Sequence, residues 1–374
     1  MIHYEESIAE AMRKDTSTIN MYGIEILTKR IPDEPRSGCL DPRELEMMKR
    51  MADESAHKEP AQNEPADAMG FTIQDLRKVM GFPNRNMNTV EIYTRYEEHD
   101  FDGNTVGIWV HWPRKPEGRK GRAGFIFIHG GGMFGGTPFD AENPCRLLAE
   151  RADCVVFNID YSLAPEKPYP NGLNDCYNAL KYIYANAEKF GVDKERIGMG
   201  GDSSGGNLTA ACAFRDRDEG TNMLKYQALI YPMIMFSNTP VAGYEWKLED
   251  YEISSEQRPF IEPGILSART SDDEKPLIDV VGMYLQHDEN PDDPTISPMH
   301  AKSHKGLCKA LVAVAEFDGV RIQGEIYGKL LKKAGVDTRI IRYKGVGHAF
   351  LNKLRYLPQT EDLVQEIAND LNKL

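Results

Sequence analysis

The sequence predicts an α/β fold in which a mostly parallel sheet is flanked by helices. Two observations lead to this prediction. Short, mostly apolar segments recur from about residue 89 onward, as expected of strands buried on both faces of a parallel sheet. Segments of helical length separate them, and this alternation is typical of a doubly wound sheet. With 374 residues, the chain is long enough for one such core and a cap.

Eight segments are predicted to be strands. The first two, at 90–96 and 106–110, flank the turn signal Asp102-Gly103-Asn104 and therefore predict a hairpin. The other six lie at 124–128, 154–159, 196–199, 226–230, 310–314 and 338–343. Helices are expected at about 141–152, 172–190, 204–217, 321–334 and 360–373. The expected architecture is a mostly parallel, eight-stranded sheet between two layers of helices.

Two regions depart from this alternation. Residues 1–88 are charged, rich in Met and interrupted by Pro, which predicts short helices, one of them over Thr72–Met80 with Thr72 as its N-cap. The stretch at about 235–290 is too long for an ordinary loop. We expect residues 1–88 to form N-terminal cap helices. We expect the insertion at 235–290, within a main domain at 89–374, to complete the helical cap.

Composition argues against several classes of protein. A formal net charge of −13 would repel a phosphate backbone, so nucleic acid is not an expected partner. No apolar stretch approaches the roughly 18 residues that span a bilayer, and the N-terminus is acidic where a signal peptide would be basic. We therefore expect no membrane segment and a cytoplasmic location.

The cysteines and histidines do not predict a bound metal or a disulfide framework. The six cysteines are scattered without Cys-x-x-Cys pairs, and several lie inside apolar segments, which favours buried free thiols. The histidines show no spacing typical of metal ligands, such as His-Glu-x-x-His. No metal or other cofactor is expected.

Ser203 lies in a context that predicts a nucleophile. The strand at 196–199 leads into Gly201-Asp202-Ser203-Ser204-Gly205, and a helix rich in small residues follows. This is the strand, turn and helix that the Gly-x-Ser-x-Gly motif requires, where a sharp turn exposes the serine hydroxyl. The helix N-terminus favours negative charge developing beside that hydroxyl. The five-residue motif alone is common by chance, so the surrounding elements carry the prediction.

A glycine-rich loop follows the strand at 124–128. In His129-Gly130-Gly131-Gly132, three consecutive glycines allow backbone amides to turn toward one point. A tetrahedral intermediate needs donors already directed at its oxyanion. We predict that the amides of Gly131, Gly132 and Ser204 form this oxyanion hole. His129 is expected to brace the loop.

Two further residues follow core strands and could complete a catalytic triad. Asp318 comes after the strand at 310–314, at the edge where α/β sheets assemble their sites. Glu316 is the rival carboxylate. His348 follows the strand at 338–343, and its small neighbours leave room for a general base to move between serine and leaving group.

As a set, these motifs resemble the hormone-sensitive-lipase-like family of esterases, which has the α/β-hydrolase fold. The family's His-Gly-Gly-Gly and Gly-Asp-Ser-Ala-Gly-Gly motifs match residues 129–132 and 201–206, and its Tyr-Arg-Leu-Ala-Pro-Glu motif is similar to residues 161–166. The resemblance covers about 90–374. It departs at the family's Asp-Pro-Leu-x-Asp pattern, where this chain keeps Asp318 but has Gly319, Val320 and Ile322.

The resemblance implies a serine carboxylesterase that hydrolyses short-to-medium acyl esters through Ser203, Asp318 and His348, with an acyl-enzyme intermediate. The expected partner is a small-molecule ester, and a homo-oligomer is compatible with the sequence. Met133 and Phe134 could bind the substrate, and Trp246 and Phe260 could line the same pocket. A small-molecule receptor on this fold is disfavoured because all three triad residues are present. A peptidase is disfavoured because a propeller or sizeable accessory domain is missing.

Overall fold

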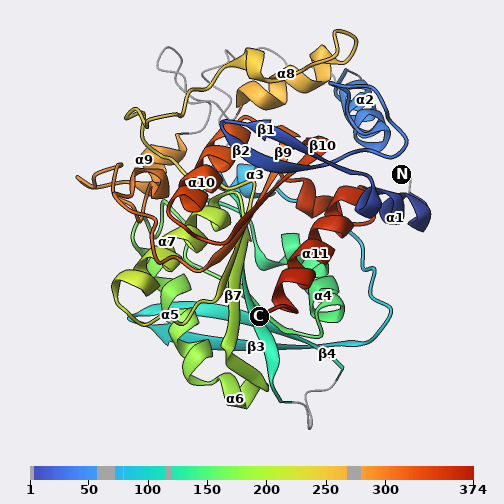
Figure 1. The fold of residues 1–374 in the computed structure, drawn as a ribbon. Coiled ribbons are helices and arrows are strands. Elements are labelled where there is room, and N and C mark those ends of the chain that lie inside the picture. The colour runs from blue at the N-terminus through green and yellow to red at the C-terminus, as the bar shows by residue number, and fades with distance from the viewer. Residues whose placement is uncertain (1–3, 57–71, 79, 115–119, 268–278) are drawn as a thin grey trace.

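A computed structural model of the chain describes residues 4–56, 72–78, 80–114, 120–267 and 279–374 (Figure 1). Its strands are β1 (Thr16–Met21), β2 (Ile24–Lys29), β3 (Ile92–Phe101), β4 (Asn104–Pro113), β5 (Arg122–Ile128), β6 (Val155–Asp160), β7 (Val192–Asp202), β8 (Tyr226–Ile230), β9 (Lys309–Phe317) and β10 (Thr338–Gly347). They form one 10-stranded sheet in the order β1-β2-β10-β9-β8-β7-β5-β6-β4-β3.

The directions of the strands confirm a mostly parallel sheet. Strands β5 to β10 pair in parallel, while β3 with β4 and β4 with β6 pair antiparallel. In the centre, Ile126 of β5 lies opposite Phe157 of β6 and Met199 of β7, so apolar side chains meet in register. All eight predicted strands are present.

Helices cover both faces of the sheet. The helices are α1 (Glu6–Lys14), α2 (Pro42–Ala56), α3 (Ile73–Lys78), α4 (Glu142–Arg151), α5 (Asn171–Ala185), α6 (Ala187–Phe190), α7 (Ser204–Asp218), α8 (Arg258–Ser267), α9 (Val280–Tyr284), α10 (Arg321–Lys333) and α11 (Pro358–Leu371). One buried apolar cluster includes residues of α5, α7 and α10, and the other includes residues of α4 and α11. Figure 1 shows these two groups on opposite sides of the sheet.

The N-terminal region contains strands as well as the expected helices. The hairpin β1–β2 turns at Tyr22-Gly23, where both residues have positive φ, as favoured two-residue hairpin turns require. Leu27 of β2 pairs in parallel with Ile341 of β10, so the hairpin extends the sheet from eight strands to ten. The prediction of helices alone for residues 1–88 was therefore incomplete.

The predicted helix at Thr72–Met80 is present as α3. Thr72 Oγ1 accepts a hydrogen bond from the Asp75 amide at 3.2 Å, and Asp75 Oδ2 accepts from the Thr72 amide at 3.2 Å. This reciprocal cap is the physical reason that the helix begins there. Residues 57–71 and 79 of the N-terminal region, and 268–278 of the insertion, lie outside the described residues. The proposed division into cap and main domain stays a prediction.

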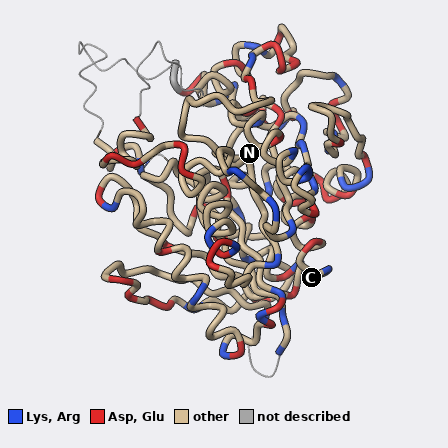
Figure 2. The backbone as a smooth tube through the Cα atoms, turned by 60° about the vertical axis from the view of Figure 1, so that its left-hand side comes forward, with Lys and Arg blue, Asp and Glu red and all other residues tan. Residues whose placement is uncertain are grey.

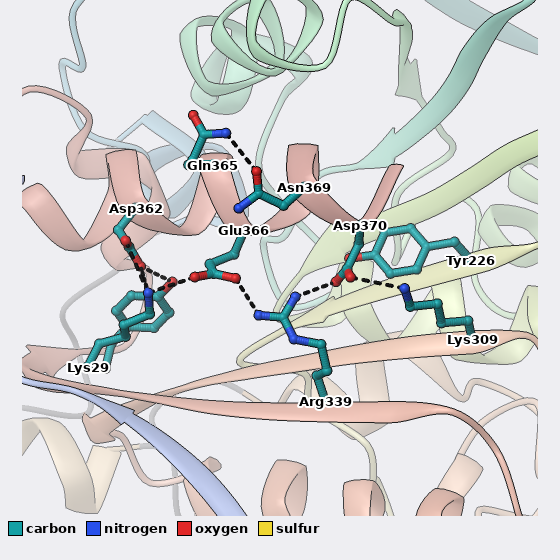
Figure 3. A network of polar contacts seen from close by, with 10 residues as sticks. Lys29, Tyr226, Lys309, Arg339, Asp362, Gln365, Glu366, Asn369 and Asp370 are labelled. Atoms are coloured by element: carbon teal, nitrogen blue, oxygen red, sulfur yellow. Dashed lines mark hydrogen bonds and ion pairs between the residues drawn. The ribbon is translucent and has the colours of Figure 1, made fainter. Parts of the chain in front are cut away.

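A partly buried network of ion pairs joins α11 to the sheet (Figure 3). Lys29, Lys309 and Arg339 extend from β2, β9 and β10, while Asp362, Glu366 and Asp370 lie four residues apart along α11. Lys29 Nζ is 3.1 Å from Asp362 and 2.6 Å from Glu366. Arg339 bridges Glu366 and Asp370, and Lys309 lies 3.0 Å from Asp370. We call these six residues the α11 ion network.

The remaining sequence predictions concern the cysteines and the charges. All six cysteines are free, and five of them are buried. Acidic and basic residues lie interspersed over the described part of the chain (Figure 2). Among the helices that the structure describes, none has both the length and the apolar character needed to cross a membrane.

Candidate active site

Ser203 occupies a sharp turn between β7 and α7. Its φ of 54° and ψ of −117° are strained for a residue with a side chain, and its amide is held by the Ile230 carbonyl at 2.9 Å. A Cβ atom on Gly201 would lie 2.4 Å from the Ile128 carbonyl oxygen, and one on Gly205 would lie 2.1 Å from the same atom. Both glycines are therefore required for the turn that presents the Ser203 hydroxyl.

A continuous hydrogen-bonded chain links Ser203 to His348 and Asp318. His348 Nε2 lies 2.9 Å from Ser203 Oγ, and His348 Nδ1 lies 2.8 Å from Asp318 Oδ2. The fully buried Asp318 also accepts the Val320 amide on Oδ1 at 3.0 Å. Because a carboxylate only accepts, it fixes the proton on Nδ1 and leaves Nε2 free to accept the serine proton. The structure thus brings together the three residues predicted from sequence.

Glu316, the rival carboxylate, has other partners. Its side chain is buried, with Oε1 2.5 Å from Lys344 Nζ and Oε2 accepting the Gly345 amide at 2.8 Å. Both partners belong to β10, so Glu316 joins the ends of β9 and β10. The carboxylate that contacts His348 is Asp318.

The surroundings of His348 favour its charged form. Burial lowers the pKa of His348, but the charge and hydrogen bond of Asp318, together with the charge of Asp202, outweigh burial and raise it. The Tyr231 ring and the imidazole also pack in an edge-to-face arrangement, with ring centroids 4.9 Å apart. The base is therefore neutral only at somewhat higher pH than an isolated histidine.

Asp202 connects the nucleophile turn to the glycine-rich loop. Its Oδ1 accepts the Gly130 amide at 2.8 Å and its Oδ2 accepts the Tyr231 hydroxyl at 3.3 Å. Burial raises the pKa of Asp202 to about 6, although these hydrogen bonds and the charge of His348 oppose the shift. Asp202 thus holds the loop in place and adds a titratable charge near the base.

The glycine-rich loop takes a conformation that only glycine adopts readily. Gly131 has φ of 131° and Gly132 has φ of 61°, and a Cβ atom on Gly131 would lie 2.0 Å from the Gly135 carbonyl oxygen. Within the described part of the chain, the amides of Gly131, Gly132 and Ser204 donate to no protein acceptor. Ser204 is also the first residue of α7, at the positive end of the helix dipole.

His129 braces the loop, in the manner expected from sequence. Its Nδ1 lies 2.8 Å from the Gly130 carbonyl, its ring stacks on Tyr161 at 4.5 Å, and the Tyr161 hydroxyl donates to the His129 carbonyl at 3.0 Å. Burial lowers the pKa of His129, which keeps the imidazole neutral.

A cavity of about 470 Å³ opens onto Ser203 and His348. Its walls are formed by Met80, Gly81, Gly130, Gly131, Gly132, Phe134, Gly136, Asp140, Asp202, Ser203, Ser267, Val280, His348, Ala349 and Asn352. Phe134, one of the residues expected to bind the substrate, lines this cavity. Met133, the other, does not: its side chain is 2% exposed and packs in the core. Trp246 and Phe260 are likewise absent from the walls.

Sequence reasoning missed the part of the wall that comes from the N-terminal region. Arg77 on α3 donates to the Phe134 carbonyl at 2.6 Å and the Ala164 carbonyl at 2.9 Å, and it forms an ion pair with Glu166 at 2.7 Å. These contacts hold α3 against the glycine-rich loop and bring Met80 to the cavity. No local signal marks Arg77, because its partners lie more than fifty residues away in the sequence.

Comparison with known proteins adds an independent line of evidence. A family model described as the alpha/beta hydrolase fold matches residues 125–352, a range that includes the glycine-rich loop, Ser203, Asp318 and His348. An arylesterase of Saccharolobus solfataricus is 31% identical over 66% of this chain and 74% of its own length. Carboxylesterase NlhH of Mycobacterium tuberculosis is 31% identical over 69% of this chain and 75% of its own. The solved structure of a hyperthermophilic esterase from the archaeon Pyrobaculum calidifontis matches with a TM-score of 0.67 and 28% identity, over 90% of this chain and 98% of that one.

Proposed function

The chain belongs to the hormone-sensitive-lipase-like family of α/β hydrolases and is a carboxylic ester hydrolase, and from this premise we propose that Ser203, His348 and Asp318 are its catalytic triad. One observation carries the proposal. The hydrogen-bonded chain from Asp318 through His348 ends at Ser203, on the wall of a cavity that also contains Gly131 and Gly132.

In the first half of the reaction, Ser203 is acylated. His348 Nε2 takes the hydroxyl proton while Ser203 Oγ bonds to the ester carbonyl carbon, and the carbonyl oxygen becomes an oxyanion. The amides of Gly131, Gly132 and Ser204 donate to that oxyanion, a contribution of roughly 2.7–4 kcal/mol per donor in comparable sites. The intermediate collapses, the bond to the alcohol oxygen breaks, and His348 gives its proton to the departing alcohol.

In the second half, water releases the acid. His348 takes a proton from water, whose oxygen bonds to the acyl carbon and forms a second oxyanion at the same amides. Collapse breaks the bond to Ser203 Oγ, which regains its proton from His348. Asp318 stabilises the imidazolium in both halves. This chemistry needs no metal or other cofactor.

We further propose that the substrates are esters with short-to-medium acyl groups. A cavity of about 470 Å³ whose apolar walls include Met80, Phe134 and Val280 has room for a small acyl ester. The relatives whose names specify arylesterase and carboxylesterase activity support an ester as the substrate class. The same set of residues disfavours a receptor without catalysis, because the base, nucleophile and acid are all present.

The test is a series of chromogenic esters from acetate to laurate, with wild-type protein and the Ser203→Ala variant. The wild type should be most active on the shorter esters, and Ser203→Ala should lose about six orders of magnitude in kcat. An inert wild type across the whole series would remove the esterase proposal. Full activity in Ser203→Ala would remove only the assignment of the nucleophile.

Three expectations from the sequence stay predictions: a cytoplasmic location, the exclusion of nucleic-acid partners, and compatibility with a homo-oligomer. The cap role of residues 1–88 and about 235–290 is a proposal as well. It is supported by the presence of Met80, Ser267 and Val280 in the cavity wall.

A further inference from the structure

The turn that carries Asp318 is held by two side chains of the insertion at 235–290. The Tyr251 hydroxyl donates to the Asp318 carbonyl at 2.9 Å, and Trp246 Nε1 donates to the Gly319 carbonyl at 3.0 Å. Tyr251 is 4% exposed. Burial raises the pKa of Tyr251, so its hydroxyl keeps its proton and remains a donor.

Arg321 also contacts Tyr251 and joins it to the end of β9. Its guanidinium lies 4.0 Å from the centre of the Tyr251 ring and is almost fully buried. It donates to the Glu316 carbonyl at 3.0 Å, at the end of β9, and to the Asp250 carbonyl at 2.7 Å, next to Tyr251 in the chain. The end of β9 and the insertion are therefore joined through one cation.

The same turn is where the sequence departs from the family resemblance. Gly319 stands where the pattern has proline, and glycine has far more backbone freedom than proline. A flexible residue directly after the triad acid would allow the Asp318 carboxylate to move out of alignment with His348. Tyr251 restricts the carbonyl of the Asp318–Gly319 peptide unit, and Trp246 restricts the carbonyl of the peptide unit that follows it.

We propose that Tyr251 is a positioning residue for catalysis, which holds the backbone of Asp318 so that its carboxylate stays aligned with His348. Trp246 assists by holding Gly319. This inference rests on the proposed role of Asp318 in the triad. It gives the insertion a function in the chemistry itself, in addition to its place in the cavity wall.

The test is Tyr251→Phe, which removes the hydroxyl and keeps the ring that contacts Arg321. A misaligned Asp318 stabilises the imidazolium less, so kcat should fall about fivefold on every ester while KM stays constant. For the same reason the pKa of His348 should fall, and the acid limb of the pH profile should move to lower pH. Asp202 and Tyr231, which also face His348, are unchanged in this variant.

Tyr327→Phe is the matched control. Tyr327 is also fully buried, but within the described residues its hydroxyl has no hydrogen-bond partner. Its removal should leave kcat and the acid limb at wild-type values. Trp246→Phe removes the donor to Gly319 and should lower kcat in the same direction as Tyr251→Phe, so it carries the prediction if Tyr251→Phe does not fold.

Failure of this inference is distinguishable from failure of the triad. If Tyr251→Phe and Trp246→Phe keep wild-type kcat and an unmoved acid limb while Asp318→Asn is inactive, the positioning role is overturned and the triad stands. Lower thermal stability with unchanged kcat would likewise reduce both residues to structural ones. Full activity in Asp318→Asn would overturn the triad, and the positioning role with it.

Discussion

The catalytic series Asp318, His348 and Ser203 and the α11 ion network are both partly buried sets of polar groups on the same sheet, but the catalytic series borders a cavity. In the α11 ion network three cations meet three carboxylates, and each carboxylate contacts at least one cation (Figure 3). In the catalytic series Asp318 is fully buried, while Ser203 and His348 border the cavity.

This difference predicts that the α11 ion network contributes mainly to stability and the catalytic residues mainly to activity. Removing the partner of a buried charge destabilises a fold. Substitutions in the α11 ion network should therefore destabilise the protein, because the network ties α11 to β2, β9 and β10. The catalytic series ends at a cavity, where the substrate supplies the last partner of Ser203. Substitutions in the two regions should therefore affect different measurements, and the following predictions test that separation.

The largest expected effect is the loss of activity in Asp318→Asn. The amide cannot stabilise the imidazolium and favours the wrong tautomer of His348, so kcat should fall about 10⁴-fold with little change in the free energy of unfolding. Asp362→Asn, in the α11 ion network, is the matched variant and should keep its kcat. Equal activity losses in the two variants would contradict the separation. Ester hydrolysis and denaturant unfolding measure both effects.

The converse prediction concerns Lys29→Met. Lys29 is 2% exposed and contacts Asp362 and Glu366, so its removal leaves two carboxylates without that cation. The free energy of unfolding should fall by about 3–5 kcal/mol, with kcat of the folded protein unchanged. Lys373→Met, at an exposed lysine, should leave stability as it is. A drop in kcat without a drop in stability would show that the network acts on the site.

Acid should inactivate the protein before it unfolds. Because the pKa of His348 is raised above 6.5 and the neutral form is the base, kcat/KM at pH 5 should lie at least about 30-fold below its plateau. Burial raises the pKa of Glu366, but Lys29 and Arg339 outweigh burial and hold that pKa below 4.5. The ionised Glu366 therefore stabilises the fold fully above pH 4.5, and this contribution is lost as pH falls through the pKa of Glu366 in the folded protein. Burial raises the pKa of Asp202 and of Asp362, and both favour the folded state in acid.

Circular dichroism and activity after return to pH 8 check this prediction. The spectrum at pH 5 should be native, and activity should recover in full. Unfolding at pH 5 would contradict the prediction that the α11 ion network keeps the protein folded there. An acid limb centred below pH 6.5 would contradict the prediction that protonation of His348 causes the loss of activity.

The smallest expected effect is that of Asp202→Asn. Loss of this negative charge should lower the pKa of His348 and move the acid limb of kcat/KM to lower pH. The Gly130 amide keeps an acceptor, so plateau kcat should change less than about threefold. An acid limb that stays in place would show that Asp202 acts on the loop alone.

The central part of this architecture is predictable because its signals are local. Ser203 and His348 each follow an apolar strand, and the small residues beside them mark the turns on which they lie. The β1–β2 hairpin is harder to recognise because β1 is an edge strand whose residues are all at least partly exposed, so it lacks a buried apolar segment. Glu316 was a rival to Asp318 because both come after the predicted strand at 310–314, and the contacts of Asp318 with His348 and of Glu316 with Lys344 exist only in the folded chain.

The cavity wall was less predictable than the triad. Phe134, predicted from its place after the glycine-rich loop to contact the substrate, lines the cavity, whereas its neighbour Met133 lies in the core. Met80 reaches the cavity through the contacts of Arg77 with Phe134, Ala164 and Glu166. Such contacts depend on the assembled fold, and no periodicity in the chain reports them.

The most direct test of the central claim is covalent labelling with a fluorophosphonate, which forms a stable bond to an activated serine. Intact mass should increase by a single adduct, and peptide mapping should locate that adduct on Ser203. Ser203→Ala should remain unlabelled, and labelling of the wild type should slow as His348 is protonated in acid. An adduct on another serine, or equal labelling of Ser203→Ala, would contradict the assignment of Ser203 as the nucleophile.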